Sequence, residues 1–247
     1  MTADYKKLDN PAWHSLTETH AGFALGNDEL KCYDPDIVLF AGFDLEEQNI
    51  TEKFDQVFKP GDSFFLFDNF PGLPANYRIE TVVQCLQMVC ETLVQAAITE
   101  NIIQLYEGNR EEMFSLVNKV FPGYYLLNTP MMGEYFGIFR EGKLVSMAGE
   151  RLRMDGLTEV SAVVTHPDHL GRKYAQQLIT HLNDKNLQAG ITPFLHTGAN
   201  NERAIKIYEL LGYKKRRIIP VTKIKRIMSL KVFRRRSSSP SPLLPGF

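Results

Sequence analysis

The residues from Thr158 to Ala175 combine the features of a binding site for an anion. Their sequence, TEVSAVVTHPDHLGRKYA, predicts a strand, a tight turn and a helix that begins shortly after Gly171. The first backbone N–H groups of a helix have no partner within it, and the helix macrodipole makes this end positive. A loop of this kind therefore presents N–H groups to a phosphate or pyrophosphate. Many such loops hold no ligand, so the pattern alone is only a weak indication of a nucleotide-type ligand.

A second strand and helix follow directly. Residues 192–197 form a short apolar run suited to a buried strand, and residues 200–212 have helical periodicity. Asn200 or Asn201 can cap this helix, and Gly212 stands where a glycine commonly ends one. The buried face of the helix is predicted to consist of Ala204, Ile207, Tyr208 and Leu211.

The surrounding residues predict the rest of one sheet. Strands are expected at residues 102–105, 134–139, 144–152 and 160–165, with a further strand from Tyr213, and helices at residues 110–120 and from about Lys173. The resulting fold class is α/β, with a mixed sheet and helices on both of its faces. Periodicity does not settle whether residues 81–89 form a helix or a strand.

The order of two motifs in this chain matches a known family. The pattern THPxxxGxxYA at residues 165–175, followed by NxxAxxxYxxxGY at 201–213, resembles the cofactor half of the GCN5-related N-acetyltransferase (GNAT) superfamily. Residues 121–124, 134–139 and 147–152 are similar to its FR47-like subgroup. The resemblance covers about residues 97–226, roughly half of the chain. It implies the acyl-CoA N-acyltransferase fold and acetyl-CoA as the acyl donor.

The resemblance also implies which residues bind acetyl-CoA. The superfamily's loop pattern is Arg or Gln, two free positions, Gly, one free position, then Gly or Ala. It covers Leu170, Gly171, Arg172, Lys173, Tyr174 and Ala175 of this chain. Two positions depart from it, because Leu170 replaces the Arg or Gln and Lys173 replaces a glycine. Lys173 either adds a compensating positive charge or crowds the site with its Cβ, and Gly171 can supply the flexible position instead.

Further contacts to the donor follow from the same resemblance. The pantetheine arm is expected to lie along the strand that precedes the loop, against Val163, Val164 and Thr165, with an N–H group near Val163 facing the carbonyl oxygen. Asn201 is expected to cap its helix and to contact the pantetheine or phosphate arm.

Acetyl transfer to an amine needs an acceptor for the amine's proton and a donor for the departing thiolate. The resemblance makes Tyr208 the proton donor to the sulfur, although core packing would also explain this tyrosine. Glu159, eleven residues before Leu170, is the candidate general base, and burial would raise its pKa toward the working range. Glu150 is a rival for this role, and water alone is a third route.

The charge distribution separates the end of the chain from the rest. The net charge is −1, but the residues from Lys214 onward hold eleven Lys or Arg and no acid, whereas the first 213 residues hold 17 basic and 29 acidic residues. Residues 227–247 are basic, rich in Ser and Pro, and predicted to be disordered. Phe233 is the one aromatic residue among these charges, fewer than base stacking requires, so the pattern does not favour nucleic-acid binding.

Residues 1–95 are predicted to form a separate acidic unit beside the acetyltransferase-like domain at 97–226. They contain 16 acidic and 6 basic residues and no second phosphate loop. We expect this α/β region to be a structural partner that covers the substrate side of the domain. Related chains carry a comparable half, in some cases a decayed acetyltransferase-like module.

Composition limits the remaining classes. The three cysteines and six histidines show no metal-ligand spacing, so we expect no metal and free thiols in a reducing compartment. No secretory signal or membrane-spanning run is recognised, which predicts a cytoplasmic protein. The sequence therefore favours an acetyl-CoA-dependent N-acetyltransferase acting by direct attack in a ternary complex on a small-molecule amine or a peptide N-terminal amine. Alternatives are a non-catalytic acyl-CoA-binding or regulatory protein and an interaction protein that uses its basic tail. The acceptor and the oligomeric state are not determined by the sequence.

Overall fold

The computed structural model describes residues 4–70 and 72–227, so the predicted basic tail lies outside it except for Ile227. The helices are α1 (Pro11–Thr17), α2 (Ile50–Val57), α3 (Arg110–Val120), α4 (Tyr174–Gln188) and α5 (Glu202–Leu210), with 3-10 helices η1 (Tyr5–Asp9), η2 (Ala21–Phe23), η3 (Glu107–Asn109), η4 (Thr129–Met132) and η5 (Pro167–His169). The strands are β1 (Ala24–Gly26), β2 (Leu30–Tyr33), β3 (Ala41–Phe43), β4 (Ser63–Phe67), β5 (Tyr77–Val89), β6 (Ile103–Leu105), β7 (Tyr135–Arg140), β8 (Lys143–Met154), β9 (Leu157–Thr165), β10 (Thr192–Gly198) and β11 (Lys214–Arg226).

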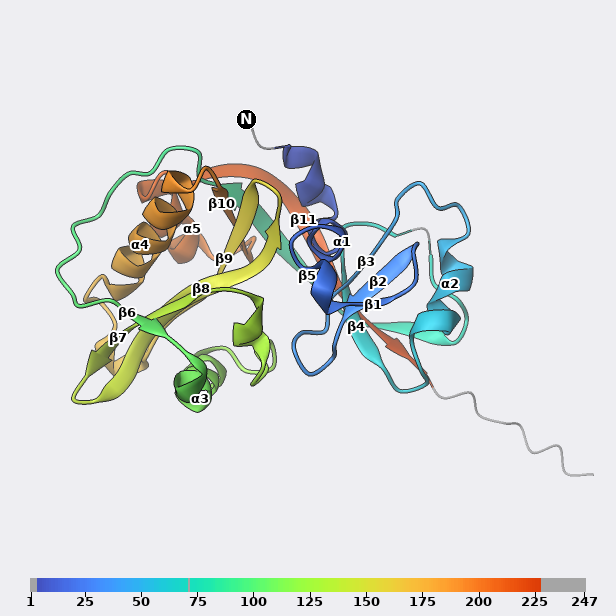
Figure 1. The fold of residues 1–247 in the computed structure, drawn as a ribbon, viewed down its shortest axis with the longest axis horizontal. Coiled ribbons are helices and arrows are strands. Elements are labelled where there is room, and N and C mark those ends of the chain that lie inside the picture. The colour runs from blue at the N-terminus through green and yellow to red at the C-terminus, as the bar shows by residue number, and fades with distance from the viewer. Residues whose placement is uncertain (1–3, 71, 228–247) are drawn as a thin grey trace, which may run out of the picture.

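Eight strands form one mixed sheet in the order β4-β11-β5-β10-β9-β8-β7-β6, and β1-β2-β3 form a small second sheet. Within the large sheet only β9 and β10 pair in parallel, joined by the crossover helix α4. The predicted α/β class with a mixed sheet is confirmed. In Figure 1, β11 arcs across the molecule from the part that holds α4 and α5 to the part that holds α2.

Strand β5 settles the ambiguity of residues 81–89. It lies between β11 and β10, pairing antiparallel with both. Leu86 and Met88 point into the cluster beneath α5, while Cys85 and Val89 point into a cluster on the opposite face. Because both faces of this part of the strand are covered by apolar residues, no alternation of polar and apolar residues marks it as a strand.

Helices cover both faces of the sheet. Tyr174, Leu178 and Leu182 of α4 pack on one face, as the helical spacing predicts, and α5 packs beside them through Ile205. On the other face, α3 buries Met113, Leu116 and Val117 against β7, β8 and β9. No helix among the described residues is long and apolar enough to span a membrane.

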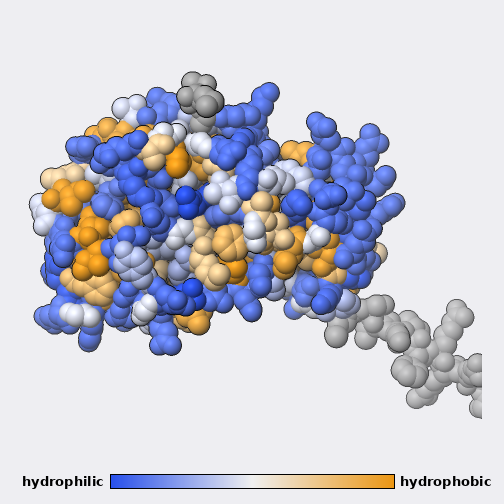
Figure 2. All heavy atoms as spheres, in the orientation of Figure 1, coloured by the Kyte–Doolittle hydropathy of each residue, from blue (hydrophilic) through white to orange (hydrophobic). Residues whose placement is uncertain are grey.

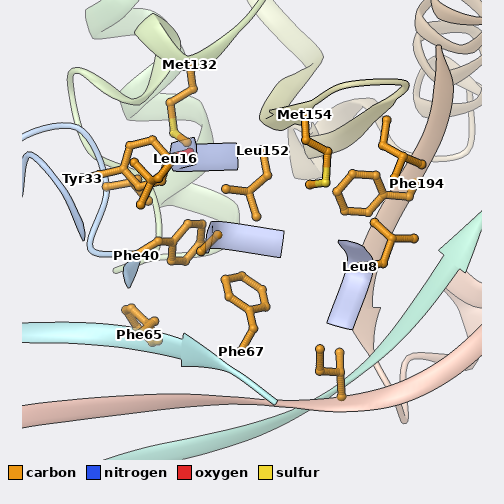
Figure 3. Close-up of a cluster of buried hydrophobic side chains, with 14 of the residues drawn as sticks. Leu8, Leu16, Tyr33, Phe40, Phe65, Phe67, Met132, Leu152, Met154 and Phe194 are labelled. Atoms are coloured by element: carbon orange, nitrogen blue, oxygen red, sulfur yellow. The ribbon is translucent and has the colours of Figure 1, made fainter. Parts of the chain in front are cut away.

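The N-terminal residues pack on the same face as α3. Leu8 and Leu16 meet Leu152 of β8, Phe194 of β10 and Phe67 of β4 in one buried cluster, shown in Figure 3. Strands β4 and β5 belong to residues 1–95 yet lie in the large sheet. The predicted boundary near residue 95 therefore does not separate two sheets, and two separate domains remain a prediction.

A buried polar cluster also fastens the N-terminal residues to the sheet. Ser15 of α1 donates a hydrogen bond to the carbonyl of Arg153, 2.8 Å away, and His20 Nδ1 lies 3.1 Å from the Ser15 hydroxyl and 2.9 Å from that of Tyr33. The pKa of His20 is lowered to about 4, mainly by burial. The nearby Arg153 also lowers it, and a backbone hydrogen bond at Met132 and the charge of Glu150 partly offset these effects. His20 is therefore neutral in the folded protein at neutral pH.

This burial predicts an acid-dependent loss of stability. Between pH 6.5 and pH 4 the unfolded chain takes up a proton at His20 and the folded chain does not, so the free energy of unfolding must fall as the pH falls. The full contribution is about 3 kcal/mol. Urea unfolding at pH 7 and pH 4.5 measures it. His20→Gln should flatten the pH dependence, whereas His14→Gln, on the less buried side of α1, should retain it; equal slopes for both variants would contradict this account.

Candidate functional site

Strands β9 and β10 part after a short parallel pairing. Their register runs from Leu157 and Thr192 to Glu159 and Phe194, and β10 then pairs only with β5, as far as Gly198. Residues 160–165 of β9 consequently pair with β8 on one side. On the other side no strand of the described residues pairs with them. We call the space between residues 160–165 and 195–198 the β9–β10 wedge. It leaves backbone N–H and C=O groups free to bond a ligand.

A bulge lies within the free part of β9. The pairing with β8 skips a residue between Ser161 and Val164, and Ala162 adopts a positive φ of 50°. A bulge of this kind bends its strand and redirects the neighbouring groups. Val163 consequently packs toward α4 and α5, while Val164 packs toward α3. The side chains thus lie on the two faces of the sheet, and the backbone is left facing the wedge. Thr165 bonds to Ser146 at 2.8 Å.

The predicted phosphate loop follows the wedge directly. Gly171, Arg172 and Lys173 are exposed, and α4 begins without a side-chain cap or an acidic residue in its first turn. Its first N–H groups are therefore open to an anion. Tyr174 is buried, with Arg140 5.2 Å above its ring, so its side chain faces the core and only its backbone is near the loop.

The backbone of the loop explains how Lys173 is accommodated. Gly171 has a φ of 79° and Lys173 a φ of 58°, in the left-handed region that glycine adopts without cost. Lys173 thus adopts a backbone conformation that suits glycine, at a cost of about 1 kcal/mol. Leu170 is half-exposed and offers no polar group to the loop.

Helix α5 brings Tyr208 to the same side of the sheet as Val163, since both pack against one cluster that includes Leu195. Asn201 caps the helix, accepting a hydrogen bond from the N–H of Ala204 at 3.2 Å. Burial raises the pKa of Tyr208 to about 12, so its hydroxyl stays protonated at neutral pH. Among the described residues, no hydrogen-bond partner meets this hydroxyl, which leaves it able to donate a proton to a ligand.

The environment of Glu159 differs from that of a general base. Both carboxylate oxygens accept hydrogen bonds from Arg151, at 2.6 and 2.8 Å, and Oε1 also lies 2.8 Å from His196 Nδ1. Burial alone would raise the pKa of Glu159, but Arg151 and His196 outweigh it and hold the pKa well below its usual range. The expectation that burial raises this pKa is therefore wrong, because a buried charge paired with two donors behaves oppositely to an isolated one.

The rival carboxylate, Glu150, also has its charge paired. Glu150 is buried on the side of α4, where its Oε1 accepts hydrogen bonds from Lys185 Nζ at 2.7 Å and Asn186 Nδ2 at 3.0 Å. The end of α4 covers it. Of the three routes for the amine's proton, water is the one that these contacts leave open.

Two histidines lie near the wedge strands. The side chain of His196 is 3% exposed, and both of its ring nitrogens have polar partners. His166 follows β9, and its Nε2 lies 2.7 Å from Lys119 Nζ. In the described part of the chain, no three His, Cys, Asp or Glu side chains are grouped to hold a metal ion.

Sequence reasoning did not identify Arg151, Gln87 and Arg216, which belong to the same buried network as Glu159 and His196. The sequence held a local signal for one part of this network, the pair of Arg151 and Glu159. Arg151 lies in the predicted strand at 144–152 and Glu159 directly precedes the one predicted at 160–165, and opposite charges commonly face each other on antiparallel neighbours such as β8 and β9. No local signal connects Gln87 to His196, because the two are 109 residues apart.

The segment after α3 includes exposed apolar residues. They follow α3 and comprise Phe121, Tyr124, Leu127 and Met131. The Tyr124 ring lies 6.1 Å from that of Phe65 on β4, which connects this patch to the N-terminal residues. Figure 2 shows apolar side chains gathered near the middle of one face, amid a largely hydrophilic surface.

Known proteins share both the sequence pattern and the fold. A family model described as FR47-like protein matches residues 135–220. A structure from Novosphingobium aromaticivorans, assigned as an acetyltransferase of the GNAT family, is 29% identical with a TM-score of 0.81, over 90% of this chain and 99% of the other. A GCN5-related N-acetyltransferase from Kribbella flavida shares the fold at 18% identity and a TM-score of 0.59, over 89% and 95% of the two chains. No curated protein sequence matches significantly.

The contacts of Glu159 predict a large loss of stability on neutralisation. Glu159→Gln should lower the free energy of unfolding by about 3 to 5 kcal/mol, because it leaves the Arg151 guanidinium buried without its counter-charge. Urea unfolding at pH 7 checks this. Glu80→Gln, which removes an exposed carboxylate paired with Lys223, is the matched control and should leave the midpoint unchanged. Similar midpoints for both variants would show that the buried pair adds little.

Proposed function

The chain belongs to the GCN5-related N-acetyltransferase superfamily and its FR47-like subgroup, and on this premise we propose that it transfers an acetyl group from acetyl-CoA to a primary amine. The single observation that carries the proposal is the parting of β9 and β10 beside the uncapped start of α4. The parting of the strands offers a free edge of β9, and the start of α4 offers free N–H groups. Together they suit an amide-containing arm that ends in phosphates.

The proposed binding residues follow from this arrangement. Val163, Val164 and Thr165 would bond the pantetheine arm through their backbone. The N–H groups from Gly171 to Ala175 would hold the pyrophosphate, with the charges of Arg172 and Lys173 beside it. The polar side chain of Asn201 is already used as a helix cap, so its proposed contact to the donor would use the group that remains, its Nδ2.

The proposed chemistry is direct attack of the amine in a ternary complex. Acetyl-CoA supplies a thioester carbonyl that is already reactive, so the protein's main contribution is to position the reactants. The N–H near Val163 would donate to the carbonyl oxygen as it gains charge. Tyr208 would give its proton to the departing thiolate. Water would take the proton of the amine, and Glu159 would hold the strand in place.

The acceptor remains a primary amine, either of a small molecule or of a peptide N-terminus. The apolar residues Phe121 and Tyr124, together with Phe65 of β4, lie where the N-terminal residues meet the α3 face. This supports the proposal that residues 1–95 shape the acceptor side. A non-catalytic acyl-CoA-binding protein is the second candidate, and the substitutions at Leu170 and Lys173 are the observation that favours it.

Binding of acetyl-CoA is the first expected outcome. Calorimetric titration should detect binding by the native protein, and saturating acetyl-CoA should raise the melting temperature. Lys173→Gly should stabilise the free protein by about 1 kcal/mol because it relieves the left-handed backbone. Glu141→Gly is the matched control, since Glu141 also has a positive φ, 51°, in the β7–β8 turn and is not among the proposed binding residues. Binding only after Lys173→Gly would mean that the native loop no longer accepts the donor.

The proposed proton donor can be tested by removing one oxygen atom. Tyr208→Phe should lower kcat by about a hundredfold, the usual scale of general acid catalysis, with little change in the Kd of acetyl-CoA. Tyr106→Phe is the control, because Tyr106 is an exposed tyrosine whose hydroxyl bonds to Gln104. Steady-state rates across pH 6–9 measure both. An unchanged kcat for Tyr208→Phe would show that the thiolate leaves without this proton.

A further inference from the structure

A continuous row of hydrogen-bonded side chains crosses the sheet beneath the N-terminal residues. Its members come from five neighbouring strands and are Arg151 of β8, Glu159 of β9, His196 of β10, Gln87 of β5 and Arg216 of β11. We call it the polar row. Glu159, His196 and Gln87 form its centre and are almost completely buried. Buried polar groups are costly unless each has a partner, so the row must be satisfied as a unit.

The partners of Gln87 determine which way its amide faces. Nε2 donates to the carbonyl of Leu8 at 2.8 Å, while Oε1 accepts from Arg216 NH1 at 2.7 Å. The reverse orientation would place oxygen against oxygen and donor against donor. The second hydrogen of Nε2 is therefore available to His196 Nε2, which lies 2.9 Å away.

The orientation of Gln87 in turn determines the tautomer of His196. Because Nε2 of the ring accepts a hydrogen bond from Gln87, it carries no proton in the neutral imidazole. Nδ1 then carries the proton and donates it to Glu159 Oε1 at 2.8 Å. Glu159 thus receives hydrogen bonds from β8 and β10 at once, and this fastens the two sides of β9.

The polar row crosses the sheet where β9 and β10 part. Glu159 and Phe194 are the last paired residues of the two strands, and His196 lies two residues beyond Phe194 on the diverging side. Leu8 and Gln87 belong to residues 1–95, so the N-terminal half contributes to the vertex of the wedge. A vertex held by charged hydrogen bonds on both strands keeps the free backbone of residues 160–165 in a constant position.

We infer that His196 is a positioning residue for acetyl transfer, which fixes Glu159 at the vertex of the β9–β10 wedge, and that Gln87 imposes this arrangement from the N-terminal half. The inference rests on the proposed function. Among the described residues, the titratable or charged groups that act on Glu159 or feel its charge are Arg151, His196, Tyr33, Cys85 and Tyr135. Of these, Arg151 and His196 bond to the carboxylate directly.

Two substitutions of His196 separate its two hydrogen bonds. His196→Asn places an amide N–H near the position of Nδ1, which keeps the donor to Glu159 and loses the contact to Gln87. His196→Gln places its amide near Nε2, which keeps Gln87 and loses Glu159. Both variants lose the same ring contacts to Phe67 and Phe194, at 5.3 and 5.8 Å, so they form a matched pair.

The expected result is a difference in kcat at similar stability. His196→Gln should lower kcat roughly tenfold or more, the scale of one lost hydrogen bond to a charge, while His196→Asn stays within about threefold of the native protein. The Kd of acetyl-CoA should change little in either variant, because the phosphate loop at residues 170–175 lies beyond the vertex. Equal kcat values for the pair, or losses of kcat that follow the melting temperatures, would overturn the inference.

A second measurement does not depend on activity. Nitrogen-15 NMR of labelled histidine in the full chain at pH 7 should show one buried imidazole protonated at Nδ1 only, assigned by its loss in His196→Asn. Gln87→Glu presents a carboxylate to Nε2 and should convert this ring to imidazolium. A ring protonated at Nε2 in the native protein would overturn the inference. The expected NMR result in a protein without acetyltransferase activity would contradict the proposed function and leave the arrangement of the polar row intact.

Discussion

A buried negative charge at the point where two parallel strands separate constrains the rest of this structure. A carboxylate removed from water is stable only with strong donors around it, and Glu159 obtains them from the strands on both sides. Those donors need partners in turn: Arg151 lies over the ring of Phe40, and His196 bonds to Gln87. The need for hydrogen-bond partners thus extends to residues of the N-terminal half. If that half left the sheet, charged groups would be exposed or would lose their partners.

This constraint explains why the two halves of the chain share one sheet. Strand β5 comes from residues 1–95 but pairs with the edge of β10 that faces away from β9, so β10 keeps a partner strand after it parts from β9. Apolar contacts support the same union, since the cluster around Leu8, Leu152 and Phe194 draws on both halves (Figure 3). The N-terminal half is thus part of the proposed site's framework.

The phosphate loop differs from this buried region, because it is exposed and its backbone is strained at Lys173. Lys173 holds a backbone conformation that suits glycine, and its side chain is exposed with no cap on the helix behind it. Such strain persists where the surrounding structure determines the backbone, here the buried strand β9 before the loop and the buried stripe of α4 after it.

The sequence by itself determined the elements that rest on local interactions. Helices α3, α4 and α5, the β7–β8 hairpin, the cap at Asn201 and the glycine turn at Gly171 all follow from spacing and turn chemistry within a few residues. Only the tertiary structure decided the place of β5 in the sheet and the partners of Glu159. The physical reason is distance along the chain: Gln87 and His196 are 109 residues apart, and the pKa of Glu159 depends on which charges the fold places beside it.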